Sequence, residues 1–348
     1  MTTQPSELAG DSLCAVILAA GKGTRMKSEK AKVLHRVFGQ PMACHVVEAV
    51  RQTDVSEIIV VIGHQRDEVE ASLSPLRVRY AYQSEQLGTG HAVRCAKEAV
   101  EAGIKDILIL CGDTPLIAPA TIAGMVATHR DRQAVLTVMT TVLENPANYG
   151  RIVTGKQGEV LRIVEEKDAT EAERLVKEVN AGIYLVNRDF LFSALEQVGT
   201  DNKQGEVYLT DIVAIATETG LQPGRFICEK PDEILGINSR LELSLAEKKL
   251  QRRYNDALMR QGVTMQDPDS VYIGREVRVG RDTFLGANLH LRGKCVIGEG
   301  CTLDSFSVLE DCVVGNDASI GPFCHLVRQN IVKNQTIPPH TRLLTPEG

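Results

Sequence analysis

Several signals of common protein classes are missing from this chain of 348 residues. No apolar run is long enough to cross a bilayer, and the first one, Leu13 to Ala20, stops after eight residues. No Cys-x-x-Cys pair occurs among the nine cysteines, which argues against a zinc ribbon and a disulfide framework. The net charge of −6 gives no sign of a nucleic-acid or anionic-membrane partner. Residues 1–12 are polar and lack the features of a signal peptide.

From these absences we expect a soluble, cytoplasmic protein with a flexible tail at 1–12. In a reducing compartment, its cysteines act as small buried hydrophobic residues. Hydrophobic residues make up 43% of the chain and charged residues 24%, as is usual for globular proteins. The length allows one large α/β domain and a smaller second unit.

The first two thirds of the chain alternate between apolar strands and helical stretches. Strands are predicted at 14–18, 57–63, 78–82 and 106–111, and helices at 41–51 and 91–102. Continuous apolar strands separated by helices indicate a Rossmann-like, mostly parallel sheet covered on both faces. Such sheets bind ligands at the carboxyl ends of their strands, where two turns lie here, Gly21-Lys-Gly23 and Gly112-Asp113.

The last third shows a different period. A charged amphipathic segment, 239–262, predicts a linker helix with Leu243, Leu250, Tyr254 and Leu258 on one face. Aliphatic residues then recur every six positions from Ile273 to Leu309 and, after a one-residue slip, from Val314 to Val332. This hexapeptide period predicts a short β-helix. The predicted domains are 13–238, 239–262 and 263–348.

The glycine-rich turn after the first strand suits a phosphate ligand. Glycines let the backbone approach a ligand and point N–H groups at its oxygens, while Arg25 and Lys32 supply positive charge. The dinucleotide fingerprint fails because its third glycine would fall at Met26. The P-loop fails because Gly21-Lys22 is followed by Gly23. Taken alone, these glycines fit an ordinary structural turn equally well.

The longer string LAAGKGTRM, residues 18–26, followed by Lys32-Val-Leu-His35, resembles the signature of the sugar-nucleotide pyrophosphorylases. It is most similar to the N-acetylglucosamine-1-phosphate uridyltransferases, which form the first half of a bacterial bifunctional enzyme and carry a left-handed β-helix. Further similar blocks follow in family order: Gln83 to Ala92 (QSEQLGTGHA), Cys111 to Leu116 (CGDTPL), Asn148 to Ile152 (NYGRI), Ile163 to Ala169 (IVEEKDA), Val179 to Gly182 (VNAG), Gly205 to Asp211 (GEVYLTD) and Gly236 to Arg240 (GINSR).

The resemblance implies a reaction and a site. UTP and N-acetylglucosamine 1-phosphate would give UDP-N-acetylglucosamine, a cell-envelope precursor, through in-line attack assisted by Mg²⁺. The catalytic residues would be Arg25, Lys32 and Asp113, and the Mg²⁺ ligands Asp113 and Asn238. The substrate-binding residues would be Leu18, Ala19, Ala20, Gly21 and Lys32 on the nucleotide; Gln83, Gly88 and Thr89 on uracil; Cys111 and Gly112 beside Asp113; Gly150, Glu165 and Asn180 on the sugar; and Asn238 at the metal. Taken alone, Asp113 and Asn238 also suit helix or turn caps, and we interpret His35 and His91 as structural.

The chain departs from the family in two places. The coil at Gly321 to Arg328 lacks the Arg-Leu-Arg-Pro-Gly run, and the later coils with the acetyl-transfer residues are missing, so we expect no acetyltransferase activity. Ala31 stands where the family usually has proline, which makes the loop before Lys32 less certain. The resemblance also implies a homotrimer formed through the β-helix. Alternatives are another sugar 1-phosphate (glucose, mannose or galactosamine), thymine as the base, a glycosyltransferase, and a nonenzymatic sensor or assembly subunit.

Overall fold

The computed structural model describes residues 12–345, which form two compact units. Unit 1 comprises the described residues up to His35 together with residues 40–240, and unit 2 comprises residues 36–39 and those from Leu241 onward. Of the predicted tail, only Ser12 lies within the described part. The helices in that part include none with the length and apolar character needed to span a membrane.

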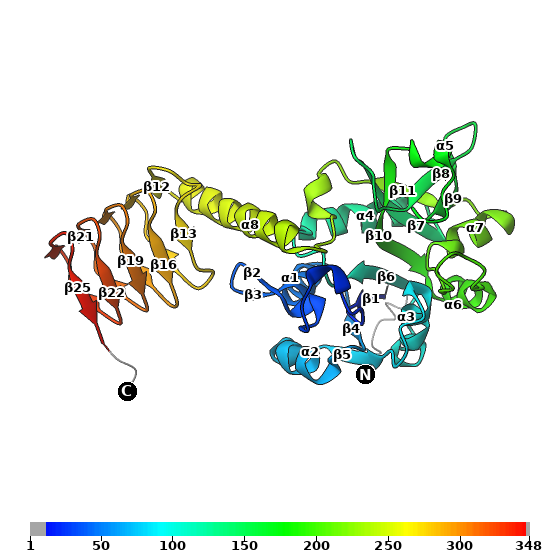
Figure 1. Ribbon diagram of the computed structural model, residues 1–348, viewed down its shortest axis with the longest axis horizontal. Helices are drawn as coiled ribbons and strands as arrows, with labels where there is room; N and C mark the ends of the chain where they lie inside the picture. Colours follow the sequence, from blue (N-terminus) through cyan, green and yellow to red (C-terminus); the bar gives the residue numbers. More distant parts are fainter. Residues whose placement is uncertain (1–11, 346–348) are drawn as a thin grey trace, which may run out of the picture. The chain divides into compact units, whose positions relative to one another are not determined.

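Unit 1 is built on a nine-stranded sheet (Figure 1). Its main path runs β11-β7-β10-β6-β1-β4-β5, and β8 and β9 form a hairpin beside β10. All strands of the main path are parallel except β10, which is antiparallel to both β6 and β7. The strands are β1 (Leu13–Leu18), β4 (Glu57–Ile62), β5 (Arg79–Tyr82), β6 (Asp106–Cys111), β7 (Leu136–Val142), β8 (Arg151–Thr154), β9 (Val160–Val164), β10 (Glu178–Asn187) and β11 (Gly224–Ile227).

Both faces of this sheet are covered. Alternate residues of β1 belong to two separate cores: Val16 packs into one and Ile17 into the other, and both are fully buried. Because side chains alternate along a strand, a strand buried on both faces must be apolar throughout. The helices of unit 1 are α1 (Met42–Arg51), α2 (Arg66–Leu73), α3 (Thr89–Cys95), α4 (Pro119–Asp131), α5 (Glu171–Arg174), α6 (Arg188–Gln197) and α7 (Asp211–Glu218), with 3₁₀ turns η1 (Thr24–Met26), η2 (Lys32–Leu34), η3 (Ser74–Leu76), η4 (Lys97–Ala99) and η5 (Pro231–Glu233).

The predicted elements lie close to the observed ones, with one shorter helix. The helix expected over 91–102 ends at Cys95, and the chain continues into η4. After the glycine-rich loop, β2 (Arg36–Val37) and β3 (Gln40–Pro41) form a short hairpin. The mostly parallel α/β fold is confirmed.

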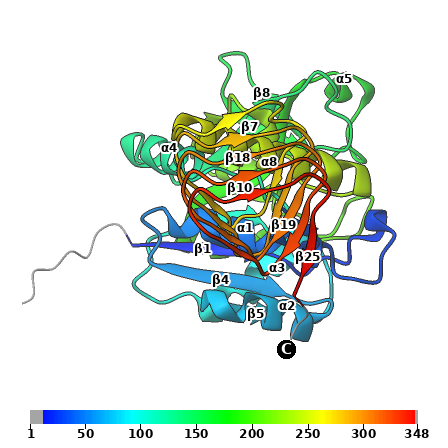
Figure 2. The same cartoon turned by 90° about the vertical axis from the view of Figure 1, so that its left-hand side faces the viewer.

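Unit 2 contains α8 (Arg240–Arg260), except for its first residue, and a left-handed parallel β-helix that follows it. Figure 2 shows its coils end on, with three stacks of short strands as the sides of a triangle. Apolar side chains fill the interior, as the hexapeptide period predicts. The stacks are β12 (Thr264–Met265), β15 (Phe284–Leu285), β18 (Thr302–Leu303), β21 (Ser319–Ile320) and β24 (Thr336–Ile337); β13 (Tyr272–Ile273), β16 (His290–Arg292), β19 (Val308–Glu310), β22 (His325–Val327) and β25 (Arg342–Leu344); and β14 (Arg278–Val279), β17 (Val296–Ile297), β20 (Val313–Val314) and β23 (Asn330–Ile331).

The predicted interior positions hold as far as Leu326, but the prediction is wrong at Val332. This side chain is 60% exposed, and Ile331, 3% exposed, fills the interior instead. In the register, Val314 pairs with Ile331, a spacing of 17 residues. The side between Leu326 and Ile331 therefore has five residues, so the one-residue slip seen before Val314 occurs a second time.

The buried face of α8 differs from the predicted apolar stripe. Its most buried residues include Gln251 and Asn255 as well as Leu258. The amide nitrogen of Asn255 donates to the carbonyls of Pro268 and Val271, both at 2.8 Å. At the start of the β-helix these carbonyls have no preceding coil to bond, so buried amides satisfy them.

Candidate active site

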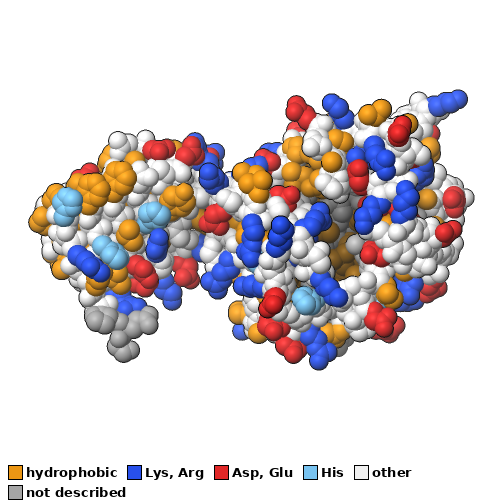
Figure 3. Space-filling view, viewed as in Figure 1, with side chains coloured by type: hydrophobic (Ala, Val, Ile, Leu, Met, Phe, Trp, Pro, Cys, Tyr) orange, Lys and Arg blue, Asp and Glu red, His pale blue; other side chains and the backbone are white. Residues whose placement is uncertain are grey.

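A pocket of about 290 Å³ opens in unit 1 at the carboxyl ends of β1 and β6. Figure 3 shows the hollow in this face, with lysine and arginine side chains around it. The predicted residues that line it are Leu18, Ala19, Ala20, Gly21, Lys32, Gln83, Gly88, Thr89, Cys111 and Asp113. Val33, Gln86, Ala92 and Glu206 complete the lining. Of the other predicted residues, Gly112 and Asn238 contact the lining residues Leu18 and Lys32, and Arg25 contacts Asn238. Gly150, Glu165 and Asn180 do not line the pocket.

The glycine-rich loop packs directly on the lysine of the pocket. Gly23 has φ +67° and directly precedes η1. A Cβ atom at Gly23 would lie 2.5 Å from Lys32 Cβ and 3.1 Å from Lys32 Cγ. A glycine at this position therefore lets the loop lie against the Lys32 stem. Gly21, by contrast, has no heavy atom within 4 Å of its Cβ position, so its Cα borders open space.

Four polar side chains converge at one end of the pocket. Lys32 Nζ contacts Asp113 Oδ2 and lies 2.9 Å from Asn238 Oδ1. Arg25 Nη2 also donates to Asn238 Oδ1, at 2.9 Å. A carboxylate oxygen and an amide oxygen thus meet at a single cationic centre, and these hard donors suit a divalent metal such as Mg²⁺.

The backbone fixes the positions of these two oxygens. Gly112 donates its N–H to the Leu18 carbonyl at 2.9 Å, which joins the ends of β1 and β6. Ile237 N donates to the Asp113 carbonyl at 2.9 Å, which brings Asn238 beside Asp113. Within residues 12–345, no group of three or more His, Cys, Asp or Glu side chains could hold a metal. A metal at this point would therefore take most of its ligands from phosphate and water.

Gln83, which is 4% exposed, lines the pocket directly after β5, a strand that β1 and β4 separate from β6. Its Nε2 donates to the Gly88 carbonyl at 3.1 Å and lies 3.1 Å from His91 Nδ1. A carbonyl can only accept, so the Gln83 nitrogen must face Gly88 and its Oε1 is left to accept. Gly88 itself has φ +109°, and a Cβ there would lie 2.5 Å from the Val207 carbonyl.

The three residues expected to hold the sugar come together from separate segments. Asn180 N donates to the Gly150 carbonyl at 2.9 Å, and a Cβ at Gly150 would lie 3.5 Å from Glu165 Oε2. The Asn180 side chain accepts from Gly182 N at 3.0 Å and donates to Tyr184 Oη at 2.6 Å. This part of β10 contains a register shift, which lets it depart from the regular sheet.

Cys111 connects the two regions. It lines the pocket, and its Sγ donates to the Gly182 carbonyl at 3.6 Å. Burial, with a contribution from the charge of Asp113, raises the pKa of the Cys111 thiol to about 12. The thiol is therefore protonated at neutral pH and a poor nucleophile.

Glu165 lies in an acidic environment. Burial raises the pKa of its carboxyl, and the hydroxyl of Thr210 opposes this. The negative charges of Asp211, Asp168 and Glu206 raise the pKa further. The ionised form of Glu165 is therefore less stable than usual in this fold and would gain from hydroxyl donors on a ligand.

Comparisons with known proteins identify the family. Residues 15–205 match the MobA-like NTP transferase domain, and residues 294–328 match the bacterial transferase hexapeptide family. The bifunctional protein GlmU of Desulfotalea psychrophila is 45% identical over 330 residues, which are 95% of this chain and 97% of that relative. The chain belongs to the GlmU family. It is a sugar-1-phosphate nucleotidyltransferase, as the sequence predicts.

Two other GlmU proteins are also similar. That of Geobacter metallireducens is 50% identical over 299 residues, 86% of this chain and 63% of the relative. That of Geotalea uraniireducens is 46% identical over 334 residues, 91% of this chain and 73% of the relative. The chain thus spans less than two thirds of one of these GlmU relatives and nearly all of the Desulfotalea relative. Nucleotidyltransferases of this family generally use a divalent metal ion.

The departure from the usual GlmU pattern at Ala31 leaves the lysine in place. Ala31 is fully buried with φ −51°, close to the value that proline would impose. Its N–H, which proline lacks, donates to Gln65 Oε1. The loop therefore keeps a proline-like backbone and gains a hydrogen bond.

Besides the apolar Val33 and Ala92, sequence reasoning missed three polar residues around the GlmU pocket. His91, interpreted as structural, contacts Gln83 and so orients a pocket side chain. Gln86 and Glu206 line the pocket directly. Both belong to blocks that the sequence already singles out, but nothing in the spacing showed which member of each block points inward.

Proposed function

We propose that this chain transfers UMP from UTP to N-acetylglucosamine 1-phosphate and releases pyrophosphate. The main support is the order of the groups in unit 1. Lys32 and Asp113 line the pocket and contact Asn238, Gln83 lines it after β5, which β1 and β4 separate from β6, and Cys111 connects the pocket to the Asn180 region. A nucleotide and a sugar phosphate could thus meet beside the cationic cluster.

The orientation of Gln83 supports uracil as the base. Its amide nitrogen is held by the Gly88 carbonyl and by His91, which leaves the carbonyl oxygen to accept. Uracil presents an N–H donor at N3, whereas cytosine presents an acceptor there. A base without the N–H would leave this buried oxygen without a partner, which is costly. Thymine shares the N–H, so this contact alone does not separate UTP from TTP.

Glu165, Asn180 and the Gly150 backbone support a neutral sugar ring as the other substrate. A carboxylate accepts from hydroxyl groups, and an amide can both donate and accept. The glycine leaves space beside Glu165 Oε2, because a Cβ at Gly150 would lie 3.5 Å from that oxygen. These groups suit the hydroxyl and acetamido substituents of N-acetylglucosamine.

The chemistry requires charge neutralisation more than proton transfer. The phosphate of the sugar is already an anionic nucleophile near pH 7, so no protein base is needed. Lys32 and Arg25 would hold the triphosphate in line and reduce the repulsion between two anions. Mg²⁺, bound by Asp113 and Asn238, would supply further charge to the phosphates when present. We therefore propose direct attack of the sugar phosphate on the α-phosphorus of UTP, with pyrophosphate as the leaving group.

The test is pyrophosphate release with UTP, Mg²⁺ and N-acetylglucosamine 1-phosphate, compared with other sugar phosphates, TTP and CTP. We expect fast release with the proposed pair and loss of about 100-fold or more in kcat for Lys32→Ala. The exposed neighbour Lys30 provides a matched control, and Lys30→Ala should keep wild-type rates. Pyrophosphate release with another sugar phosphate would change the proposed substrate but would agree with the proposed mechanism. No release with any pair would favour a nonenzymatic role.

We also propose that unit 2 forms a homotrimer. Its outer surface carries exposed apolar side chains, including Val296, Phe306, Val313 and Phe323, and Figure 3 shows hydrophobic patches on this unit. The rings of Phe306 and Phe323 stack at 5.2 Å. Light scattering of the purified chain should give three times the chain mass, and a monomer mass would refute the proposal.

The absence of acetyltransferase activity stays a prediction for this chain. It rests on the sequence of the coil at Gly321 to Arg328, which lacks the family's Arg-Leu-Arg-Pro-Gly run. We expect no release of coenzyme A from acetyl-CoA with glucosamine 1-phosphate. Measurable turnover by the purified chain would show that this prediction is wrong.

A further inference from the structure

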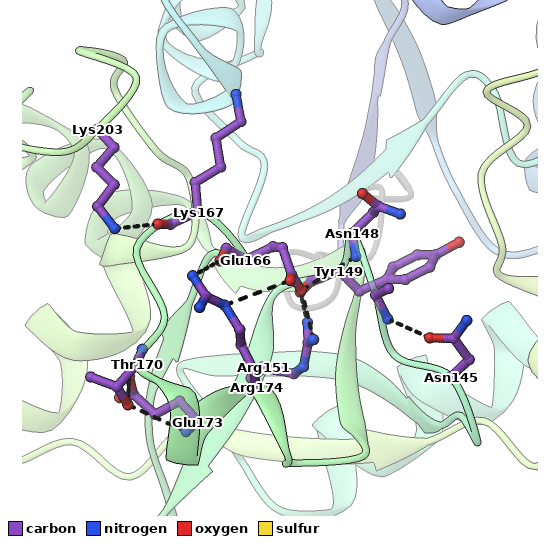
Figure 4. Close-up of polar contacts among 11 residues, drawn as sticks. Asn145, Asn148, Tyr149, Arg151, Glu166, Lys167, Thr170, Glu173, Arg174 and Lys203 are labelled. Carbon is purple, nitrogen blue, oxygen red and sulfur yellow. Dashed lines mark hydrogen bonds and ion pairs between the residues drawn. The ribbon is translucent and has the colours of Figure 1, made fainter.

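Behind the proposed sugar region lies a buried arginine that the reaction described above does not use. Arg151 is the first residue of β8, directly after Gly150, and is 2% exposed. Its Nη1 donates to the Tyr149 carbonyl, and its Nη2 donates to Glu166 Oε2 at 2.6 Å (Figure 4). One guanidinium therefore binds the backbone of the Gly150 turn and the loop that follows β9.

Glu166 is the centre of this arrangement. Besides Arg151, its Oε2 accepts from Asn148 N at 3.3 Å, and Asn148 has φ +71°. Arg174 of α5 approaches Glu166 Oε1 at 3.8 Å and donates to its backbone carbonyl at 3.5 Å (Figure 4). Glu166 thus joins three segments: the turn at 148–150, its own loop, and α5.

The two glutamates of this loop contact different partners. Glu165 Oε2 borders the space at Gly150, whereas Glu166 contacts Arg151 and Arg174. The two glutamates begin a turn, in which the Glu165 carbonyl accepts from Asp168 N at 3.0 Å and from Ala169 N at 2.9 Å. A movement of Glu166 would therefore move Glu165, and a movement of Arg151 would move Gly150.

Stability alone does not account for this ion pair. The Arg151 Nε–H is buried and finds no hydrogen-bond partner among the described residues. Burying a guanidinium with an unsatisfied donor is unfavourable, and buried ion pairs often contribute little net stability. What the guanidinium does provide is a fixed geometry between two loops, because it donates to the Tyr149 carbonyl through Nη1 and to Glu166 through Nη2.

We propose that the Arg151–Glu166 pair is a positioning device that sets the distance between Gly150 and Glu165, and with it the affinity for the sugar phosphate. This inference rests on the proposed function, in which those two residues hold the sugar. Neither residue lines the pocket at Gln83 and Lys32. The pair therefore acts on the affinity for the sugar phosphate and has no effect on that for UTP.

The first test is steady-state kinetics of Glu166→Ala and Arg151→Met. We expect KM for N-acetylglucosamine 1-phosphate to rise about tenfold, the usual effect of losing a charge-assisted contact, with KM for UTP changed less than about twofold. Glu166→Gln should restore most of the affinity, because an amide oxygen still accepts from Arg151. Arg151→Lys should not, because an ammonium lacks the planar fork.

A matched control comes from the same part of unit 1. Arg162 of β9 lies opposite Val153, and its side chain pairs with Glu173 of α5, so Arg162→Ala should leave both KM values unchanged. In the double variant Arg151→Met/Glu166→Ala, KM for the sugar phosphate should be no higher than in the more impaired single variant, because the two residues act as one unit. Equal increases in both KM values, or an unchanged KM for the sugar phosphate, would overturn the inference.

A binding measurement separates this inference from the proposed function. Calorimetric titration should show weaker binding of UDP-N-acetylglucosamine by Glu166→Ala, by about tenfold, with unchanged binding of UDP. If the wild type bound UDP-N-acetylglucosamine but released no pyrophosphate, the proposed function would fail while this comparison still tested the pair. If the wild type failed to bind UDP-N-acetylglucosamine, the proposed function and the positioning role of the Arg151–Glu166 pair would both be refuted.

Discussion

Two glycines of the glycine-rich loop and one of a distant turn should respond differently to substitution by alanine. Gly23 combines φ +67° with a Cβ position only 2.5 Å from Lys32 Cβ. Gly158, in the turn between β8 and β9, has φ +82° and no atom within 4 Å. Gly21 has no atom within 4 Å and no left-handed backbone, but it lines the pocket. Alanine at these three positions therefore tests collision, backbone strain and ligand approach separately.

The magnitudes follow from the geometry. Left-handed backbone costs a non-glycine residue about 1–2 kcal/mol, which is the whole effect expected for Gly158→Ala. Gly23→Ala adds a collision with Lys32 Cβ, an atom that cannot rotate away, and overpacking of this kind costs roughly 1–3 kcal/mol more. Gly21→Ala should change the free energy of unfolding by less than about 0.5 kcal/mol.

The assays are urea unfolding and pyrophosphate release. Because the collision displaces Lys32, Gly23→Ala should lower kcat, whereas Gly158→Ala should keep wild-type activity. Gly21→Ala should raise KM for UTP without a loss of stability, because the added methyl meets only the ligand. A Gly23→Ala protein as stable and active as Gly158→Ala would refute the reasoning about the collision. An unchanged KM for UTP in Gly21→Ala would refute the role of this loop at the phosphates.

Three further predictions concern the metal, pH and the β-helix. Asp113→Ala should abolish the dependence of the rate on Mg²⁺ concentration and lower kcat by about 100-fold or more, as measured by magnesium titration. The fold raises the pKa of the Glu165 carboxyl. The free energy of unfolding therefore falls as the pH rises above the ordinary pKa of glutamate, and the loss is complete once the pH exceeds the raised pKa. Glu165→Gln should thus unfold at a higher temperature than wild type at pH 8, and this difference should disappear as the pH falls toward 4. The same variant should bind the sugar phosphate more weakly. Ile331→Ala should lose about 2–5 kcal/mol of stability and Val332→Ala less than about 0.5 kcal/mol in urea unfolding, and the reverse order would contradict the second slip.

Much of unit 1 could be predicted because its strands are buried on both faces. The run at 106–111, for example, has four fully buried residues, Ile107 to Leu110, and a continuous apolar run of this kind indicates a central strand. The antiparallel course of β10 between β6 and β7 was not predicted, because strand direction depends on long-range connections rather than on local pattern.

In unit 2, periodicity identified the fold but not each position. The second five-residue side moved Ile331 inward and Val332 outward, and two adjacent β-branched residues give no local signal for this shift. The buried amides of Gln251 and Asn255 were missed for a related reason. Hydrophobic patterns find apolar faces, whereas these side chains are buried because backbone carbonyls need partners.

The candidate site could be predicted as a set of residues, but not as an arrangement. The sequence blocks contain Asp113 and Asn238, and only the folded chain shows that both oxygens meet Lys32. Likewise, no sequence spacing links Arg151 to Glu166, because their contact depends on how two loops fold back on each other.

The most direct test of the central claim is ³¹P NMR of the purified chain with UTP, Mg²⁺ and N-acetylglucosamine 1-phosphate. The account predicts that UDP-N-acetylglucosamine and pyrophosphate appear in equal amounts, and that neither appears at a comparable rate with Asp113→Ala. Unchanged substrate signals with the folded wild-type chain, or equal turnover by the variant, would contradict it.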